Sequence, residues 1–265
     1  MSDILEELAE MRRQDAKIRE TDVPFDLMLR WAMKMPEARD FAAAFRGGKN
    51  SATPRIIAEL KRASPSEGMI REAFHPVELA HELENAGAAT LSVLCEPHRF
   101  LGGEDYLREV RAAVSLPVLY KDFITTRYPL TAARAAGADA ALLIAAVLDD
   151  AALKDLLAFA HELGLAALVE THDEVEIARA VECGARIIGV NCRNLRNFST
   201  DVSLLEALVG KIPAGCVRIA ESGMHTAEAI ARAKAAGADG FLVGTALMRA
   251  NRPGDKLKEL LAQQH

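Results

Sequence analysis

Glu59 and Lys61 are the first residues of the sequence whose types and spacing suggest chemistry. They lie two positions apart in a segment that is otherwise apolar from Ile56 to Leu60 and that ends in the turn-forming residues Ser64-Pro65-Ser66. Residues two apart on a β-strand project to the same face, so the carboxylate and the ammonium would lie side by side. Burying two charges in an apolar strand is costly unless they pair or take part in a reaction. The spacing therefore indicates acid–base chemistry, with a structural ion pair at a barrel end as the alternative.

Further charged and polar residues stand where other apolar segments end. Lys121, Glu170 and Asn191 each follow directly on a predicted strand, and Arg193 and Glu221 occupy similar positions. Such a mixture lets one carboxylate act as acid or base while an ammonium donates a proton to a developing charge. Charge alone does not assign these roles.

A second group of residues closes the last two predicted strands. Ser222 and Gly223 follow one of them, and Gly244 and Thr245 follow the other. Glycines let an anion approach backbone N–H groups and hydroxyls donate hydrogen bonds, so this combination is typical of a phosphate site. Two tight turns that require glycine are the alternative interpretation.

The elements that must position these residues follow a repeated pattern. Four segments contain a small residue, Gly and Ala followed by an apolar run, and in each a helix is predicted to end on the glycine: Gly87, Gly137, Gly184 and Gly237. Together with the apolar segments between these repeats, the sequence predicts strands at residues 56–60, 90–94, 117–120, 141–144, 165–169, 187–190, 217–220 and 241–243.

The predicted strands alternate with helical patterns, for example at residues 131–136, 151–163 and 226–235. Near-continuous apolar strands alternating with helices indicate a parallel sheet covered on its outside. Eight such units predict an α/β fold, a (β/α)8 TIM barrel, with its chemistry at the C-terminal ends of the strands. A doubly wound sheet is the alternative, but no GxGxxG follows the first strand.

Residues 1–50 are predicted to form an N-terminal helical extension of a single barrel domain spanning residues 1–265. Apolar positions at helical spacing predict a first helix over residues 4–18. A second is expected from about Asp26, as its N-cap, to Trp31, and a third over residues 36–45. The pattern leaves open whether the extension packs under the barrel or across its mouth.

Composition narrows the class of protein. The 265 residues are half hydrophobic and carry a net charge of −6 without a basic tract, so nucleic-acid binding is not expected. No apolar run is long enough to span a membrane and the start does not resemble a signal peptide, so we expect a cytoplasmic protein without a membrane partner. The four cysteines favour reduced thiols, and the seven histidines have no metal-binding spacing, so no metal site is predicted.

Six motifs, in order and in register, resemble the signature of the indole-3-glycerol phosphate synthase family. They are IIAELKRASPSEG at residues 56–68, KDF at 121–123, VETH at 169–172, GVNCRNL at 189–195, AESG at 220–223 and VGTALM at 243–248. The resemblance extends from about residue 54 to residue 250, and the helical extension is also similar to that of the family.

The resemblance implies a lyase that closes a ring in tryptophan biosynthesis, with decarboxylation and dehydration. The substrate would be 1-(2-carboxyphenylamino)-1-deoxyribulose 5-phosphate, and the products would be indole-3-glycerol phosphate, carbon dioxide and water. No cofactor would be needed. The implied partner is this phosphorylated small molecule, and we expect a monomer or a weak homodimer.

The resemblance also implies roles for single residues. Lys121 would be the general acid that protonates the substrate carbonyl oxygen while the aromatic carbon attacks. Glu170 would stabilise the cationic intermediate and help to remove a proton, and Glu59 and Lys61 would serve the dehydration, with Lys61 also near substrate anions. The other implied site residues are Asn191 and Glu221 for catalysis, Ser64, Phe100, Phe123 and Arg193 for substrate binding, and Ser222, Gly223, Gly244 and Thr245 for phosphate binding.

Some neighbouring residues are predicted to be structural. His172 follows Glu170, and we expect its side chain to alternate away from the barrel interior. Cys192 is expected to face the helices for the same reason. The histidines outside the motifs, His225 among them, are expected at the surface or in caps.

Two other classes of function stay open at this point. One is a different phosphate-binding barrel enzyme, either a sugar-phosphate isomerase or an aldolase that forms a Schiff base through Lys121 or Lys61. Neither requires the spacing of Glu59 and Lys61. The other is a non-catalytic barrel scaffold, which would be expected to lose catalytic residues one by one, whereas all of them are present here.

Overall fold

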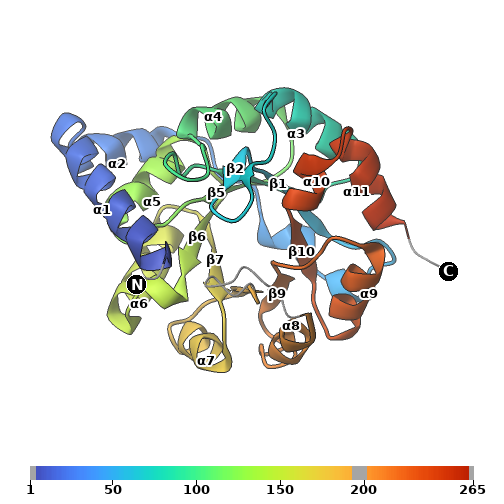
Figure 1. The fold of residues 1–265 in the computed structure, drawn as a ribbon. Coiled ribbons are helices and arrows are strands. Elements are labelled where there is room, and N and C mark those ends of the chain that lie inside the picture. The colour runs from blue at the N-terminus through green and yellow to red at the C-terminus, as the bar shows by residue number, and fades with distance from the viewer. Residues whose placement is uncertain (1–3, 193–201, 263–265) are drawn as a thin grey trace.

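Eight parallel strands close into a barrel in the computed structural model of the chain, which describes residues 4–192 and 202–262. Around the barrel the strands follow the order β1, β10, β9, β8, β7, β6, β5 and β4. Figure 1 shows these strands in the middle of the molecule with helices around them and with α1 and α2 at one side. The predicted (β/α)8 barrel is confirmed.

The strands and helices lie close to the predicted ranges. The barrel strands are β1 (Ile56–Leu60), β4 (Thr90–Leu94), β5 (Val118–Lys121), β6 (Ala140–Ile144), β7 (Ala166–Thr171), β8 (Ile187–Val190), β9 (Val217–Ala220) and β10 (Gly240–Val243). The helices around them are α3 (Pro76–Asn85), α4 (Glu104–Ala113), α5 (Arg127–Ala135), α6 (Asp150–Glu162), α7 (Glu174–Glu182), α8 (Val202–Val209), α9 (Ala227–Ala235), α10 (Thr245–Arg249) and α11 (Pro253–Leu261). A short ribbon of β2 (Ala63–Ser64) and β3 (Gly68–Met69) follows β1.

The four glycine repeats end helices in the predicted way. Gly87, Gly137, Gly184 and Gly237 have φ angles between 94° and 107°, the left-handed region that favours glycine. In the first repeat the N–H of Ala88 donates to the carbonyl of Leu83 across the helix end, and the other three repeats make the equivalent bond. This pattern satisfies the last helical carbonyls and turns the chain into the next strand.

Residues 36–50 form the floor of the barrel instead of the predicted third helix. Only η1 (Ala42–Phe45) and η2 (Gly48–Asn50) are helical there, both as short 3-10 turns. Phe41 and Phe45 are 1% exposed and pack with apolar residues of the barrel interior. Since this segment is held by tertiary contacts, its helical pattern did not decide its conformation.

Two aspartates of the glycine repeats anchor the floor segment to the barrel. Asp139 accepts hydrogen bonds from the backbone N–H groups of Val118 and Arg39, at 2.9 and 2.8 Å. Asp239 accepts one from the N–H of Arg218, at 3.1 Å, and lies 3.4 Å from the N–H of Lys49. Each carboxylate thus joins the start of a barrel strand to the floor segment.

The first helix, α1 (Ile4–Asp22), lies at the opposite end of the barrel, beside Asp122, which directly follows β5. Arg12 donates to both carboxylate oxygens of Asp122, with Nε–Oδ1 and Nη2–Oδ2 distances of 2.9 and 2.7 Å. The hydroxyl of Tyr120 donates a hydrogen bond to the same carboxylate, at 3.1 Å. The second helix, α2 (Phe25–Lys34), packs on α5 and starts after Pro24, so Asp26 lies in its first turn and is not the N-cap. The extension therefore reaches both ends of the barrel.

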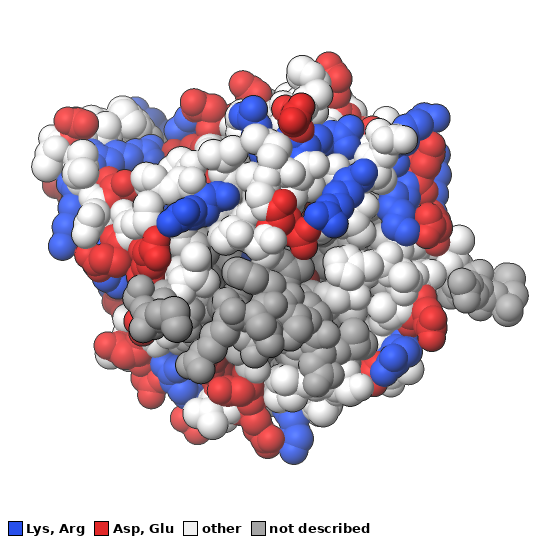
Figure 2. Space-filling view, in the orientation of Figure 1, with Lys and Arg blue, Asp and Glu red and all other residues white. Residues whose placement is uncertain are grey.

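Charges of both signs are interspersed over the described part of the face that carries the strand ends (Figure 2). Within the described residues, no helix combines the length and apolar character needed to cross a membrane.

The floor segment should contribute measurably to stability. Phe45→Ala is expected to lower the free energy of unfolding by about 3–5 kcal/mol, because it removes a fully buried ring and leaves a cavity. Urea denaturation would measure this loss, with Ile18→Ala as the control variant. Ile18 is an exposed apolar residue on α1, and its replacement should change the free energy of unfolding by less than about 0.5 kcal/mol. Equal effects of the two substitutions would contradict the assignment of Phe45 to the core.

Candidate active site

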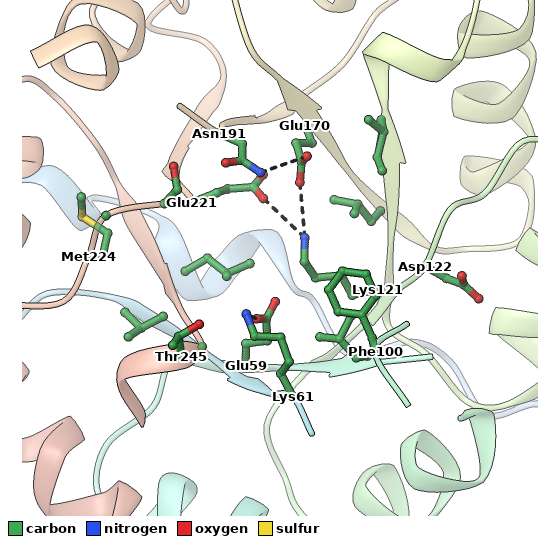
Figure 3. A pocket seen from close by; sticks show the side chains of 18 of the residues that line it. Glu59, Lys61, Phe100, Lys121, Asp122, Glu170, Asn191, Glu221, Met224 and Thr245 are labelled. Carbon is green, nitrogen blue, oxygen red and sulfur yellow. Dashed lines mark hydrogen bonds and ion pairs between the residues drawn. The ribbon is translucent and has the colours of Figure 1, made fainter. Parts of the chain in front are cut away.

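A pocket opens at the C-terminal ends of the barrel strands and brings together residues from all around the barrel. It holds about 930 Å³ of empty space, the open solvent at its mouth included. The predicted site residues that line it are Glu59, Lys61, Phe100, Lys121, Phe123, Glu170, Asn191, Glu221, Ser222, Gly223, Gly244 and Thr245. Figure 3 shows the side chains of most of them directed into the same space.

The ammonium of Lys121 lies between two carboxyl groups at the centre of this pocket (Figure 3). Its Nζ is 3.3 Å from Oε2 of Glu170 and 3.7 Å from Oε2 of Glu221. The amide of Asn191 donates to Oε1 of Glu170 at 3.1 Å. Glu170 and Glu221 are only 4% and 7% exposed, so their interactions with Lys121 are poorly screened by water.

Burial and neighbouring charges shift the pKa values of these groups in different directions. For Glu170, burial raises the pKa, but Lys121 and His172 outweigh it and the pKa lies well below its usual range. For Glu221, burial and the charge of Glu170 raise the pKa well above its usual range, against the opposing effect of Lys121. Burial lowers the pKa of Lys121, but the surrounding carboxylates raise it above its usual value. Two adjacent carboxyls with pKa values pushed apart are suited to different roles, one as an ionised group and the other as a proton carrier.

Glu59 and Lys61 lie side by side, as their spacing predicts, and form an ion pair. The distance from Lys61 Nζ to Glu59 Oε1 is 2.7 Å, and both side chains are buried beside the end of β10. Gly244 makes this arrangement possible, because a Cβ atom there would overlap Oε1 of Glu59. Gly189 serves Glu221 in the same way, since a Cβ atom on β8 would overlap the Glu221 carboxyl.

One wall of the pocket is apolar and carries two aromatic rings. The ring centroids of Phe100 and Phe123 are 6.2 Å apart. Glu96 fixes the loop that carries Phe100: its carboxylate accepts the backbone N–H groups of His98, Arg99 and Phe100 at 2.7–2.8 Å. A buried carboxylate with three donors holds this loop in one conformation, and therefore holds the ring in place.

The opposite side of the pocket offers hydrogen-bond donors. Among the described residues, the hydroxyls of Ser222 and Thr245 are buried and find no partner. Gly223, between the two strand ends, has a φ of 79°, a conformation that side-chain-bearing residues rarely adopt. Unpaired buried hydroxyls are costly unless a ligand satisfies them, so this side is suited to an anion.

Two predicted site residues are not among those that line the pocket. Ser64 lies in β2, where its hydroxyl is 3.3 Å from that of Ser66, and its role in substrate binding stays a prediction. Arg193 lies outside the described residues.

Several pocket residues were not predicted from the sequence. Leu142 and Ile144 line the pocket from β6, which carries no polar group there, and Leu242 lines it from β10. The two-residue spacing of Leu142 and Ile144 places them on one face of the strand but does not indicate that this face borders a cavity. Leu5 contributes from α1, which decides that this part of the extension lies at the mouth. His225 is exposed, as expected of a surface residue, but also lines the pocket.

His172 is not among the residues that line the pocket, in keeping with the expectation that it turns away from the barrel interior. Its ring nevertheless contacts Glu170, with Nε2 at 3.3 Å from Oε1, which was not predicted. Cys192 is buried in the layer between strands and helices, as predicted.

No group of three or more potential metal ligands occurs among the described residues.

Comparisons with known proteins agree with the site. A family model described as indole-3-glycerol phosphate synthase matches residues 5–260. The chain is 45% identical over 262 residues to the indole-3-glycerol phosphate synthase of Albidiferax ferrireducens, covering 99% of both chains. It is 44% identical over 247 residues to that of Campylobacter curvus, covering 93% of this chain and 94% of the relative.

Solved structures with low sequence identity share the fold. The thiamine phosphate pyrophosphorylase of Pyrococcus furiosus has a TM-score of 0.59 at 15% identity, over 79% of this chain and 94% of that one. The N-acetylmannosamine-6-phosphate 2-epimerase of Clostridium perfringens also has a TM-score of 0.59, at 18% identity, over 78% of this chain and 92% of that one. Since the family model covers nearly the whole sequence and the more similar relatives carry the same name, this chain belongs to the indole-3-glycerol phosphate synthase family.

Proposed function

We propose that this protein is an indole-3-glycerol phosphate synthase of tryptophan biosynthesis, a carbon–carbon lyase of the carboxy-lyase type. It would convert 1-(2-carboxyphenylamino)-1-deoxyribulose 5-phosphate into indole-3-glycerol phosphate, carbon dioxide and water, without a cofactor. Family membership supports the reaction. The observation at the site that carries the proposal is the Lys121 ammonium held between the carboxyls of Glu170 and Glu221.

The two sides of the pocket match the two ends of this substrate. The hydroxyls of Ser222 and Thr245, with the backbone beside Gly223 and Gly244, would bind the phosphate. The anthranilate ring would pack on the apolar wall that contains Phe100 and Phe123. Arg193 and Ser64 are proposed to contact the substrate as well.

Ring closure needs an acid at the substrate carbonyl and a stabilising charge near the ring. In our proposal Lys121 donates a proton to the carbonyl oxygen as the carboxylate-bearing ring carbon forms the new C–C bond. Glu170 stabilises the resulting cation, and loss of carbon dioxide returns the bonding electrons to the ring. Asn191 keeps the Glu170 carboxylate in place, which the hydrogen bond at 3.1 Å supports.

The last step removes water from the ring-closed intermediate. The former carbonyl oxygen leaves with an added proton, and a proton is lost from the ring to form the indole double bond. The Glu59–Lys61 pair, one a proton donor and the other an acceptor at 2.7 Å from each other, is suited to this step. Glu221, whose pKa is raised, would carry a proton beside Glu170 and help to position the intermediate.

A Schiff-base aldolase is disfavoured by the surroundings of Lys121. An amine nucleophile must lose its proton, and a lowered pKa favours that loss. The carboxylates around Lys121 raise its pKa instead.

We further propose that the protein is cytoplasmic, a location that fits its four free cysteines. We also propose that it is a monomer or a weak homodimer.

The proposed reaction can be observed directly. Purified protein mixed with the carboxyphenylamino-deoxyribulose phosphate, without added metal or cofactor, should produce indole absorbance and fluorescence. Glu170→Gln, which keeps the shape but removes the charge, should lower the rate by about 10²-fold or more. Ligand binding without any indole signal from the unaltered protein would reject the proposed reaction.

The roles of the two lysines can be separated by single-turnover kinetics. Lys121→Ala should slow ring closure by about 10²- to 10⁴-fold, the usual contribution of a general acid. Lys61→Ala should leave ring closure close to normal and slow the later dehydration, so that a ring-closed intermediate accumulates. If Lys121→Ala closed the ring at the normal rate, the assignment of the acid would be wrong.

Loss of a hydrogen bond to the substrate phosphate should raise KM. Thr245→Val removes a hydroxyl but keeps the shape, and loss of a hydrogen bond to a charged group should raise KM roughly 10- to 150-fold. The change in kcat should be smaller, because the phosphate does not react. Thr21→Val, on the exposed face of α1, is the matched control and should leave KM unchanged.

A further inference from the structure

His172 lies behind Glu170, outside the residues that line the pocket, and contacts two carboxylates. Its Nε2 is 3.3 Å from Oε1 of Glu170, within ion-pair distance but outside hydrogen-bond geometry, and its Nδ1 is hydrogen-bonded to Oε2 of Glu176 at 3.1 Å. The side chain is 19% exposed. An imidazole between two partly or fully buried carboxylates is placed to carry a positive charge.

The start of α7 holds the His172 ring in this position. Asp173 is the N-cap of α7 and accepts the backbone N–H of Glu176 at 2.8 Å. Glu176 in turn reaches back and accepts the backbone N–H of His172, also at 2.8 Å. These reciprocal bonds resemble a capping box. One carboxylate therefore binds both the backbone and the ring of His172.

The two oxygens of the Glu170 carboxylate have different partners. Oε1 is contacted by His172 and by the amide of Asn191, whereas Oε2 faces the ammonium of Lys121. Without His172, Glu170 would keep Lys121 as a cationic partner, but the same ammonium is also within 3.7 Å of Glu221. His172 is thus a second cation, on the outer side, that favours the ionised form of Glu170 together with Lys121.

We propose that His172 is a positioning residue for the reaction: as an imidazolium clamped by Glu176, it orients the Glu170 carboxylate towards Lys121 and keeps it ionised. This inference rests on the proposed function of Glu170. His172 itself does not touch the substrate.

The charge of His172 should persist at the pH of the cell. Burial lowers the pKa of the imidazole, but Glu170 and Glu176 outweigh this effect and raise it to about 10. Lys121 and Glu221 lie on the other side of the Glu170 carboxylate, and the carboxylate of Asp173 is engaged at the start of α7. The ion pair is therefore present below pH 10 and lost as the pH rises through that value.

The test compares His172→Gln with the intact enzyme in steady-state and single-turnover assays across pH. Loss of the charged contact should lower kcat about 10- to 100-fold with KM changed less. The acidic limb of kcat against pH should move up by about one unit or more, because Glu170 loses a cationic neighbour. His161→Gln is the matched control: His161 is exposed at the end of α6, at the far end of the barrel, and should change neither quantity.

A merely structural role would give a different result. It predicts a lower melting temperature for His172→Gln with kcat and the acidic limb unchanged, and this outcome would overturn the inference. His172→Lys, which restores a cation, should bring the acidic limb back towards its original position.

A second measurement needs no activity. Long-range ¹H–¹⁵N NMR of the intact protein should show both ring nitrogens of His172 protonated at pH 8. A ring that titrates near its ordinary pKa would reject the clamp even if the variant failed to fold. Absence of indole formation by the intact protein, with the imidazolium present, would instead reject the proposed function and leave the clamp in place.

Discussion

The charge of Lys121 organises the active site of this protein. Two buried carboxyls, one on β7 and one directly after β9, meet at this ammonium, and the ionised one would be costly to bury without a cation. Because Glu170 has further partners in Asn191 and His172, while Glu221 has none of comparable strength among the described residues, the two carboxyls differ in pKa. The barrel thus obtains an ionised group and a proton carrier from one residue type, which is the division that a reaction with both acid and base steps requires.

The N-terminal extension is part of this arrangement and not an appendage. At one end, Phe41 and Phe45 fill the floor of the barrel, below the layer of apolar residues that supports the pocket. At the other end, Arg12 of α1 pairs with Asp122, the residue after Lys121. The strand end that carries the central ammonium is thereby fixed from outside the barrel, by a helix more than a hundred residues away in sequence.

The barrel and most of the site could be predicted from the sequence, because both depend on local rules. Glycine at helix ends, apolar strands and polar residues after them identify the strands and their C-terminal ends without tertiary information. The conformation of the floor segment could not be predicted in this way. Residues 36–45 have a helical pattern, but tertiary contacts such as the hydrogen bond from the Arg39 N–H to Asp139 determine their conformation instead. The contacts of His172 with Glu170 and Glu176 could not be predicted either, because they depend on how α7 starts after β7. The apolar pocket residues Leu142 and Ile144 escaped because apolar side chains in a strand give no sign of lining a cavity.

The central claim is that Glu170 is ionised and Glu221 protonated around one ammonium, because Glu170 is also contacted by Asn191 and His172. Carbon-13 NMR of protein labelled in the glutamate carboxyl carbons tests it most directly, with Glu221→Gln and Glu170→Gln used for assignment. At neutral pH, Glu170 should be ionised and Glu221 protonated. The signal of a protonated carboxyl should therefore be lost in Glu221→Gln. A protonated signal that belongs to Glu170, or two carboxyls that titrate together near their ordinary pKa, would contradict it.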